Sequence, residues 1–195
     1  DFISTFGNLK LDTYDNKYFP SSGLFFSGDF HWYLYSSDFN KNFNPFSIAK
    51  AKIGYATTII DNVSLNISSE GGFKIGDKST NSLDFVLGGF GNNFINNYTS
   101  FLGYDFLSFT GNSFVKGTLA IDYNFLTKHH VNLTANYANA GNDIFRSGEW
   151  FTEPDFSGYA VGYGLETFFG PLQVKYAWTP QQEKDQLYFS VGFWF

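Results

Sequence analysis

The feature that most constrains the fold of this sequence is an alternation of apolar and small polar residues that returns in segment after segment. In Gln186–Phe195 every second residue from Leu187 onward is apolar, with Ser190 and Gly192 among the residues between them. Because residues two apart share one face of a β-strand, each such segment predicts a strand with one apolar and one polar face. Nine segments follow the pattern, at about 3–13, 24–35, 49–60, 63–75, 115–125, 131–138, 159–166, 172–179 and 186–195. A weaker tenth strand is predicted over 83–87.

The length of these segments points to a membrane. Most reach ten residues or more, whereas strands of globular proteins average about five to six, and a tilted strand needs about 9–11 residues to cross a bilayer. No apolar run in the sequence is long enough for a transmembrane helix. Strands cross lipid only as a closed barrel, since every backbone group must be paired. The sequence therefore predicts an all-β protein, an antiparallel transmembrane β-barrel with about nine or ten strands in this chain.

Composition and loop lengths indicate the bacterial outer membrane. Aromatic residues make up 22% and charged residues only 15%, which suits a wall between lipid and water. The connections at 61–62, 127–130 and 169–171 are short, and those at 36–44, 76–112, 140–156 and 180–185 are longer. Short periplasmic turns and long outer loops are typical of outer-membrane barrels. Membrane lipid and lipopolysaccharide are therefore the expected surroundings.

Several classes of function are disfavoured. A net charge of −6 argues against nucleic acid as a partner, and the absence of cysteine removes disulfide and thiolate chemistry. No cofactor or metal site is predicted, because His129 and His130, placed in a polar turn, have no third ligand spaced to join them. The first residue, Asp1, is compatible with a mature end, a processing product or the edge of a fragment.

The ending Tyr188-Phe-Ser-Val-Gly-Phe-Trp-Phe195 resembles the final strand by which outer-membrane barrels are recognised for assembly. The resemblance implies the barrel-assembly machinery as a partner. Tyr188, Phe193 and Phe195 are the candidate assembly signal.

Three further stretches resemble the bacterial surface antigen superfamily: Leu11–Gly23 with its Phe-Pro-x-x-Gly ending, Leu87–Phe90 followed by Phe101–Tyr104, and Phe169–Trp178 with its Gly-Pro opening. The resemblance spans residues 1–195. It implies one barrel domain that is the C-terminal half of a sixteen-stranded barrel, with loop 76–112 folded into the lumen. The candidate lumen-loop residues are Gly88, Gly89, Leu102, Gly103 and Tyr104. Leu102 stands where this superfamily usually has an arginine.

Within that superfamily, the chain resembles most the patatin-like outer-membrane proteins of Bacteroidota-type bacteria, in the overall character of its sequence more than in any one motif. This implies a barrel that anchors or exports a passenger domain, or that works with a partner outer-membrane protein. The chain has no Gly-x-Ser-x-Gly nucleophile motif, so no catalytic residue is assigned and any lipase domain is expected upstream.

Eight charged residues are predicted to face the lumen: Lys50, Lys52, Glu70, Lys74, Lys116, Asp122, Glu166 and Lys175. They fit either a pore lining or a set that pairs across the lumen and holds a plugging loop, and the second interpretation is favoured. Two other functions stay open. One is a self-contained small barrel that acts as a channel or adhesin, and the other is a lipid enzyme that uses His31 near Asp29.

Overall fold

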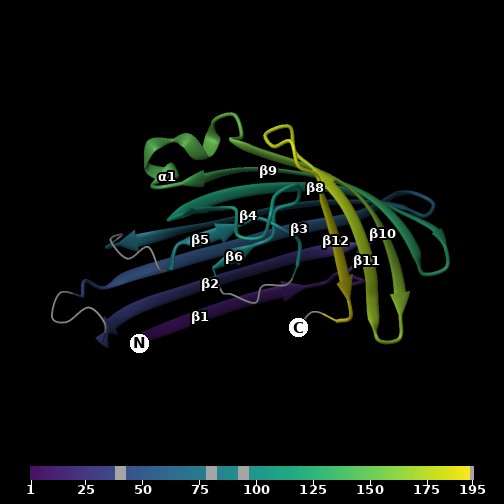
Figure 1. Ribbon diagram of the computed structural model, residues 1–195. Coiled ribbons are helices and arrows are strands. Elements are labelled where there is room, and N and C mark those ends of the chain that lie inside the picture. Colours follow the sequence, from purple (N-terminus) through teal and green to yellow (C-terminus); the bar gives the residue numbers. More distant parts are fainter. Residues whose placement is uncertain (38–42, 78–82, 92–96, 194–195) are drawn as a thin grey trace.

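The computed structural model describes residues 1–37, 43–77, 83–91 and 97–193 and is built around one antiparallel sheet of nine strands (Figure 1). Each strand pairs with its neighbour along the chain, apart from β4, which pairs with β8. The strands of this wall are β1 (Phe2–Asp12), β2 (Gly23–Ser36), β3 (Phe46–Ile60), β4 (Val63–Gly76), β8 (Ser113–Leu126), β9 (His129–Gly141), β10 (Phe156–Thr167), β11 (Gly170–Trp178) and β12 (Gln186–Val191). All nine predicted strands are confirmed. No helix in the described residues is long and apolar enough to cross a membrane.

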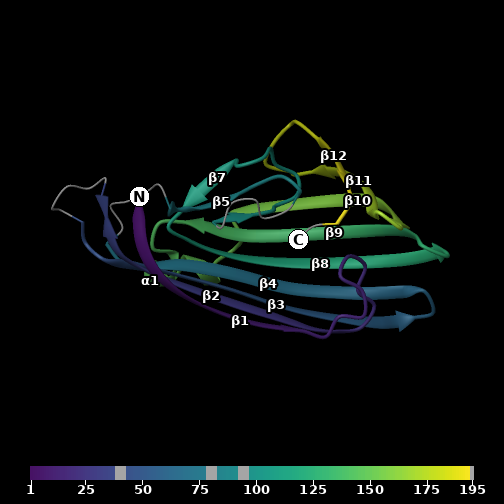
Figure 2. The same cartoon turned by 90° about the horizontal axis from the view of Figure 1, so that it is seen from below.

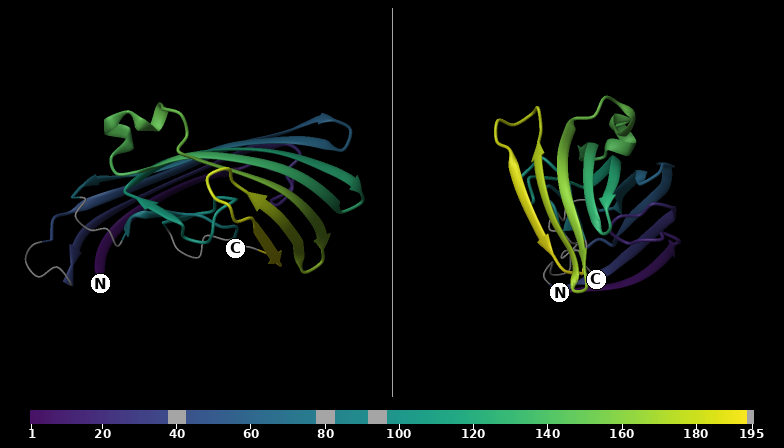
Figure 3. Two further views of the ribbon diagram at one scale, coloured as in Figure 1. Left: turned by 45° about the horizontal axis from the view of Figure 1, so that its top comes forward. Right: turned by 90° about the vertical axis from the view of Figure 1, so that its right-hand side faces the viewer.

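The sheet curves into a trough with β1 and β12 at its two edges (Figures 2 and 3). The described residues of β1 and β12 do not pair with each other. The predicted tenth strand exists as β5 (Phe85–Leu87), but it lies outside the wall. It pairs with β6 (Tyr98–Thr99) and β7 (Phe109–Gly111) in a small sheet of its own.

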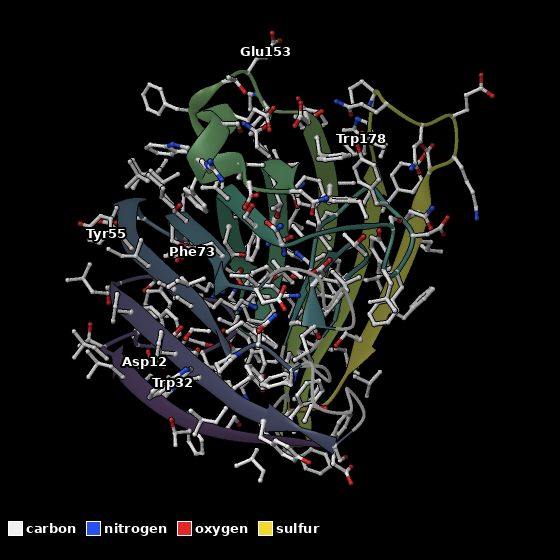
Figure 4. All side chains as sticks on the ribbon, turned by 90° about the vertical axis from the view of Figure 1, so that its left-hand side faces the viewer. Asp12, Trp32, Tyr55, Phe73, Glu153 and Trp178 are labelled. Atoms are coloured by element: carbon white, nitrogen blue, oxygen red, sulfur yellow. The ribbon has the colours of Figure 1, made fainter. Side chains whose placement is uncertain are left out.

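The two faces of the wall divide as the alternation predicts. On β4 the outward positions carry Ile67, Phe73 and Ile75, which are exposed, whereas Glu70 and Lys74 point inward and are buried. Figure 4 shows the side chains of Trp32 and Tyr55 on the outer side of the strands. Because the side-chain period of a strand is two residues, one register fixes this division along the whole strand.

The two ends of the sheet carry different connections. At one end the turns 61–62, 127–128 and 168–169 are tight, and Asn62 and Lys128 adopt positive φ angles of 64° and 68°. The longer connections other than 13–22 lie at the other end, including the one that holds α1 (Ile144–Ser147) and a 3₁₀ turn, η3 (Glu149–Phe151). The placement of His130 in a polar turn is wrong, because this residue lies in β9 and is buried.

The apolar core lies between the concave face of the wall and the connection from β4 to β8. Phe46 and Phe114 of the wall pack with Phe85, Leu87 and Phe101 of that connection, and each is at most 2% exposed. This core is contributed by the inside of the trough, so the connection is packed against the wall and is not a free loop.

Candidate functional site

The inner segment, residues 83–91 and 97–112, lies along the concave face of the trough (Figures 2 and 3). It contains all five candidate lumen-loop residues. Its contacts with the wall define the candidate site.

A buried charged group fixes the middle of the inner segment. The ammonium of Lys50 lies 3.0 Å from the carboxylate of Glu70 and donates a 3.0 Å hydrogen bond to the carbonyl of Tyr98. The hydroxyl of Thr99 donates to the same carboxylate at 3.0 Å. On the next strand, Lys116 donates to the carbonyl of residue 100 at 2.6 Å. Burying a charge is costly unless it is paired, so these contacts tie three consecutive segment residues to β3, β4 and β8.

The peptide groups of Leu102 are held by one side-chain amide. Asn136 of β9 accepts a 2.9 Å hydrogen bond from the Leu102 N–H, and its own amide donates to the Leu102 carbonyl at 3.4 Å and to the Gly158 carbonyl at 3.0 Å. The Leu102 side chain packs with Ala160 and Ala177. An apolar side chain among small apolar residues therefore occupies the position where the superfamily resemblance predicts an arginine.

Two of the glycines are required by backbone geometry. Gly103 has a φ of +90°, and a Cβ there would lie 2.7 Å from the carbonyl oxygen of Trp178. Gly88 has a φ of +135°, and its Cβ would lie 2.3 Å from the carbonyl oxygen of Asp105. Only glycine accommodates both conditions at low cost. Gly89 also has a positive φ, of 72°.

Tyr104 connects the inner segment to β12 and to the residue that follows β11. Its hydroxyl accepts a 3.2 Å hydrogen bond from Thr179, and its carbonyl accepts a 2.6 Å hydrogen bond from the hydroxyl of Tyr188. Of the candidate assembly residues, Tyr188 thus faces the inside of the trough. Phe193 is half exposed, with its ring 6.3 Å from that of Tyr18, and Phe195 lies outside the described residues.

The remaining inward charges have different partners. Lys74 pairs with Asp84 at the start of the inner segment. Lys175 donates a 2.9 Å hydrogen bond to Asn132, a wall residue. Lys52 lies opposite Glu70 in the register and 5.7 Å from the ring of Phe25. Some of the predicted charges therefore contact the inner segment and others contact only the wall.

A second cluster, which the sequence did not reveal, lies at the end of the tight turns. The connection 13–22 between β1 and β2 places the Phe19 ring flat on the His130 ring, with centroids 4.0 Å apart and an interplanar angle of 6°. A Cβ on Gly164 would lie 2.4 Å from the Phe19 ring, so glycine there makes room for it. The connection therefore reaches across the trough from β1 and β2 to β9 and β10.

Charged groups surround this stack. His130 Nδ1 is 2.7 Å from the Asp122 carboxylate, and Nε2 is 3.5 Å from Glu166. The side-chain amide of Asn16 donates to Glu166 at 2.5 Å. Two of the predicted lumen charges, Asp122 and Glu166, therefore belong to this cluster and not to the inner-segment site. The only sequence signal for this cluster is the Phe-Pro pair in Leu11–Gly23, the stretch that resembles the superfamily.

The structure gives no support to chemistry at His31. Its ring stacks on Phe6 at 5.5 Å, and Asp29 accepts a hydrogen bond from Asn8. None of the hydrogen bonds observed among the described residues joins His31 to Asp29. No group of three or more His, Cys, Asp or Glu residues in the described ranges is arranged to hold a metal ion.

Comparisons with known proteins agree with this architecture. A search of curated protein sequences gives no significant match. The fold is similar to the crystal structure of BamA from Haemophilus ducreyi lacking POTRA domains 1–3, with a TM-score of 0.70 and 12% sequence identity. The match covers 95% of this chain and 40% of that chain, so the present chain corresponds to less than half of that protein.

The model of the OMP85 superfamily matches residues 1–195, the whole of the chain. Together with the long, two-faced strands and the segment folded onto their concave side, this match decides the family. The chain belongs to the OMP85 superfamily of outer-membrane β-barrel proteins.

Proposed function

We propose that this chain is the C-terminal half of a larger barrel that anchors or exports a passenger, and that the loop 76–112, which contains the inner segment, plugs the barrel. The observation that carries the proposal is the attachment of the inner segment to the wall. Hydrogen bonds hold it on four separate strands: Lys50 and Lys116 donate to its carbonyls, and Glu70 and Asn136 accept from its Thr99 hydroxyl and Leu102 N–H. A segment held in this way occupies the space that an open pore would need.

The passenger that we propose is a patatin-like lipase domain located upstream of Asp1. Its support is the superfamily resemblance. The chain itself contains no Gly-x-Ser-x-Gly motif, so the proposal places the lipase nucleophile in that domain. On this proposal the eight inward charges and the lumen-loop residues serve assembly and plugging, and catalysis belongs to another domain.

The intact mass of the native polypeptide, extracted from outer membranes in detergent, tests the passenger. We expect a mass several-fold above the 22.1 kDa of this chain and lipase activity in the purified protein. A native mass near 22.1 kDa would refute the passenger.

A second candidate function is a channel. It is favoured by a cavity of about 830 Å³ beside the inner segment, lined by Asn8, Asp29, His31, Lys50 and Lys52 among others. In this case the inner segment would narrow the pore and not close it.

Ion conductance across planar bilayers separates the plug from the channel. We expect the full-length protein to conduct poorly and a variant lacking residues 84–110 to conduct well. Similar, high conductance of both proteins would favour the channel. The deletion is interpretable only if the variant keeps the heat-modifiable gel mobility of a folded barrel, which serves as the control.

A further inference from the structure

One long connection folds back over the outer, convex face of the wall. We call residues 142–155 the outer loop; it contains α1 and η3. Its Phe145 ring packs against Phe73 with centroids 5.4 Å apart, and it reaches within 4.0 Å of the place where a Cβ on Gly71 would stand. Phe73 and Gly71 occupy outward positions of β4. Figures 1 and 3 show α1 on the opposite side of the sheet from β5 and β6.

Outward-facing polar side chains fix the outer loop in this position. Asn139, on an outward position of β9, is only 3% exposed. It donates to the Glu149 carbonyl at 2.7 Å and accepts from the Asp155 N–H at 2.7 Å. Ser113, on an outward position of β8, accepts from the Ile144 N–H at 3.1 Å. The loop therefore satisfies polar groups that the wall would otherwise present to lipid.

The free side of the outer loop is aromatic. Phe145, Trp150 and Phe151 are 39%, 43% and 82% exposed, and neighbouring rings lie 5.9 Å and 5.3 Å apart. A folded segment that holds three adjacent aromatic rings in the open is unfavourable in water and marks a contact surface.

We propose that the outer loop is an anchor in the outer leaflet of the membrane, with Phe145, Trp150 and Phe151 inserted at the boundary between lipid headgroups and acyl chains. Aromatic rings favour that boundary, and their position here is continuous with the lipid-facing wall. On β9, β10 and β11 the same face carries Tyr137 and Tyr159, whose hydroxyls are 3.0 Å apart, and Trp178 stacked on Tyr159. These rings extend the aromatic surface sideways from the loop.

The position of the outer loop over the sheet favours lipid as its contact, and not another part of the same protein. It covers β4, β8 and β9, which are the central strands of the nine. Further wall strands would pair with β1 or β12 at the edges, so they would not cover the loop. The outer face of an outer-membrane barrel is surrounded by lipid.

Single nitroxide labels test the anchor in the full-length protein, reconstituted into vesicles of phosphatidylcholine and phosphatidylglycerol. Residues 1–195 contain no cysteine, so each introduced cysteine is the single labelling site within them, and any cysteine elsewhere in the protein is first replaced by serine. The variant Phe151→Cys reports the anchor. Glu153→Cys lies two residues further along the same loop, where Figure 4 shows Glu153 pointing away from the sheet, and is the aqueous control. Leu133→Cys, on the exposed outward face of β9, is the lipid reference.

Collision with oxygen and with a water-soluble nickel chelate measures the depth of each label. We expect the label at position 151 to collide with the chelate at least about threefold less often than the label at 153, and to resemble the label at 133 in its oxygen preference. Equal chelate collision at 151 and 153 would overturn the proposal and indicate a water-facing surface for another protein. Gel mobility of the folded barrel shows that each variant is assembled.

Discussion

The attachment of the inner segment makes a quantitative prediction for Asn136→Ala. This substitution removes the partner of both Leu102 peptide groups and one partner of the Gly158 carbonyl. A buried peptide group without a partner costs about 1–3 kcal/mol. Because the bond to the Leu102 carbonyl is long, at 3.4 Å, its loss counts at the low end. We expect the free energy of opening of the segment around Leu102 to fall by about 2–4 kcal/mol.

Amide hydrogen exchange of the protein in lipid measures this opening directly. A fall of about 2–4 kcal/mol corresponds to an increase of about thirtyfold to several hundredfold in the exchange rate of residues 98–104. Exchange of the central wall strands should change little, because their backbone ladder is intact.

Asn132→Ala is the matched control. Asn132 lies on the same strand and the same face and is similarly buried, but its hydrogen bond joins it to Lys175 of the wall. We expect this variant to leave exchange at 98–104 unchanged. Unaltered exchange in Asn136→Ala, or equal acceleration in both variants, would refute the reasoning that the Asn136 amide holds the segment.

Four further outcomes are expected. Gly164→Ala should displace Phe19 from His130 at a cost of about 1–3 kcal/mol and speed proteolysis of connection 13–22, whereas Gly117→Ala, with open space at its Cβ, should not. Glu70→Leu alone should loosen the inner segment more than the double variant Glu70→Leu/Lys50→Met, measured by the same exchange, since a buried charge without its partner is worse than an apolar pair. Burial alone would raise the pKa of Asp15, but hydrogen bonds from Ser21, Ser22 and Asn16 outweigh it and lower the pKa. The ionised Asp15 therefore stabilises connection 13–22 above about pH 4, and this stabilisation is lost as the pH falls through the lowered pKa. A spin label at position 17 should gain mobility in that range, and Asp15→Asn should abolish the pH response. Deletion of Phe195 should reduce the amount of folded, heat-modifiable barrel in the outer membrane, and normal assembly would contradict its role in the assembly signal.

The wall could be predicted from the sequence because its information is local. The alternation along β4 or β12 is visible within ten residues, and the pairing of neighbours follows from short turns such as 61–62. The place of β5 could not be predicted in this way. Three apolar residues followed by Gly88 and Gly89 look the same whether they extend the wall or pack inside it, so only tertiary contacts decide between the two.

The candidate site was predictable by residue type but not by partner. Alternation places Lys50, Glu70 and Lys116 on the inner face, yet it does not tell which of the inward charges meet the inner segment. That depends on where residues 98–100 cross the wall, and their partners are 16 to 48 residues away in sequence. Asn136 was missed for a related reason, since an inward asparagine on a polar face is ordinary until the Leu102 peptide lies against it.

The two attachments that the sequence did not predict, Asn136 on Leu102 and Phe19 on His130, share a physical cause that also explains the organisation of the chain. A curved sheet leaves its concave face without a second layer, and a barrel wall cannot bury that face by stacking against another sheet. This chain covers the face with two of its own connections, which enter from opposite ends. The inner segment is fixed by Asn136 and the buried charges, and connection 13–22 is fixed by the stack of Phe19 on His130. Each attachment joins residues far apart in sequence, so the loss of either should loosen one end of the trough while the strand ladder persists.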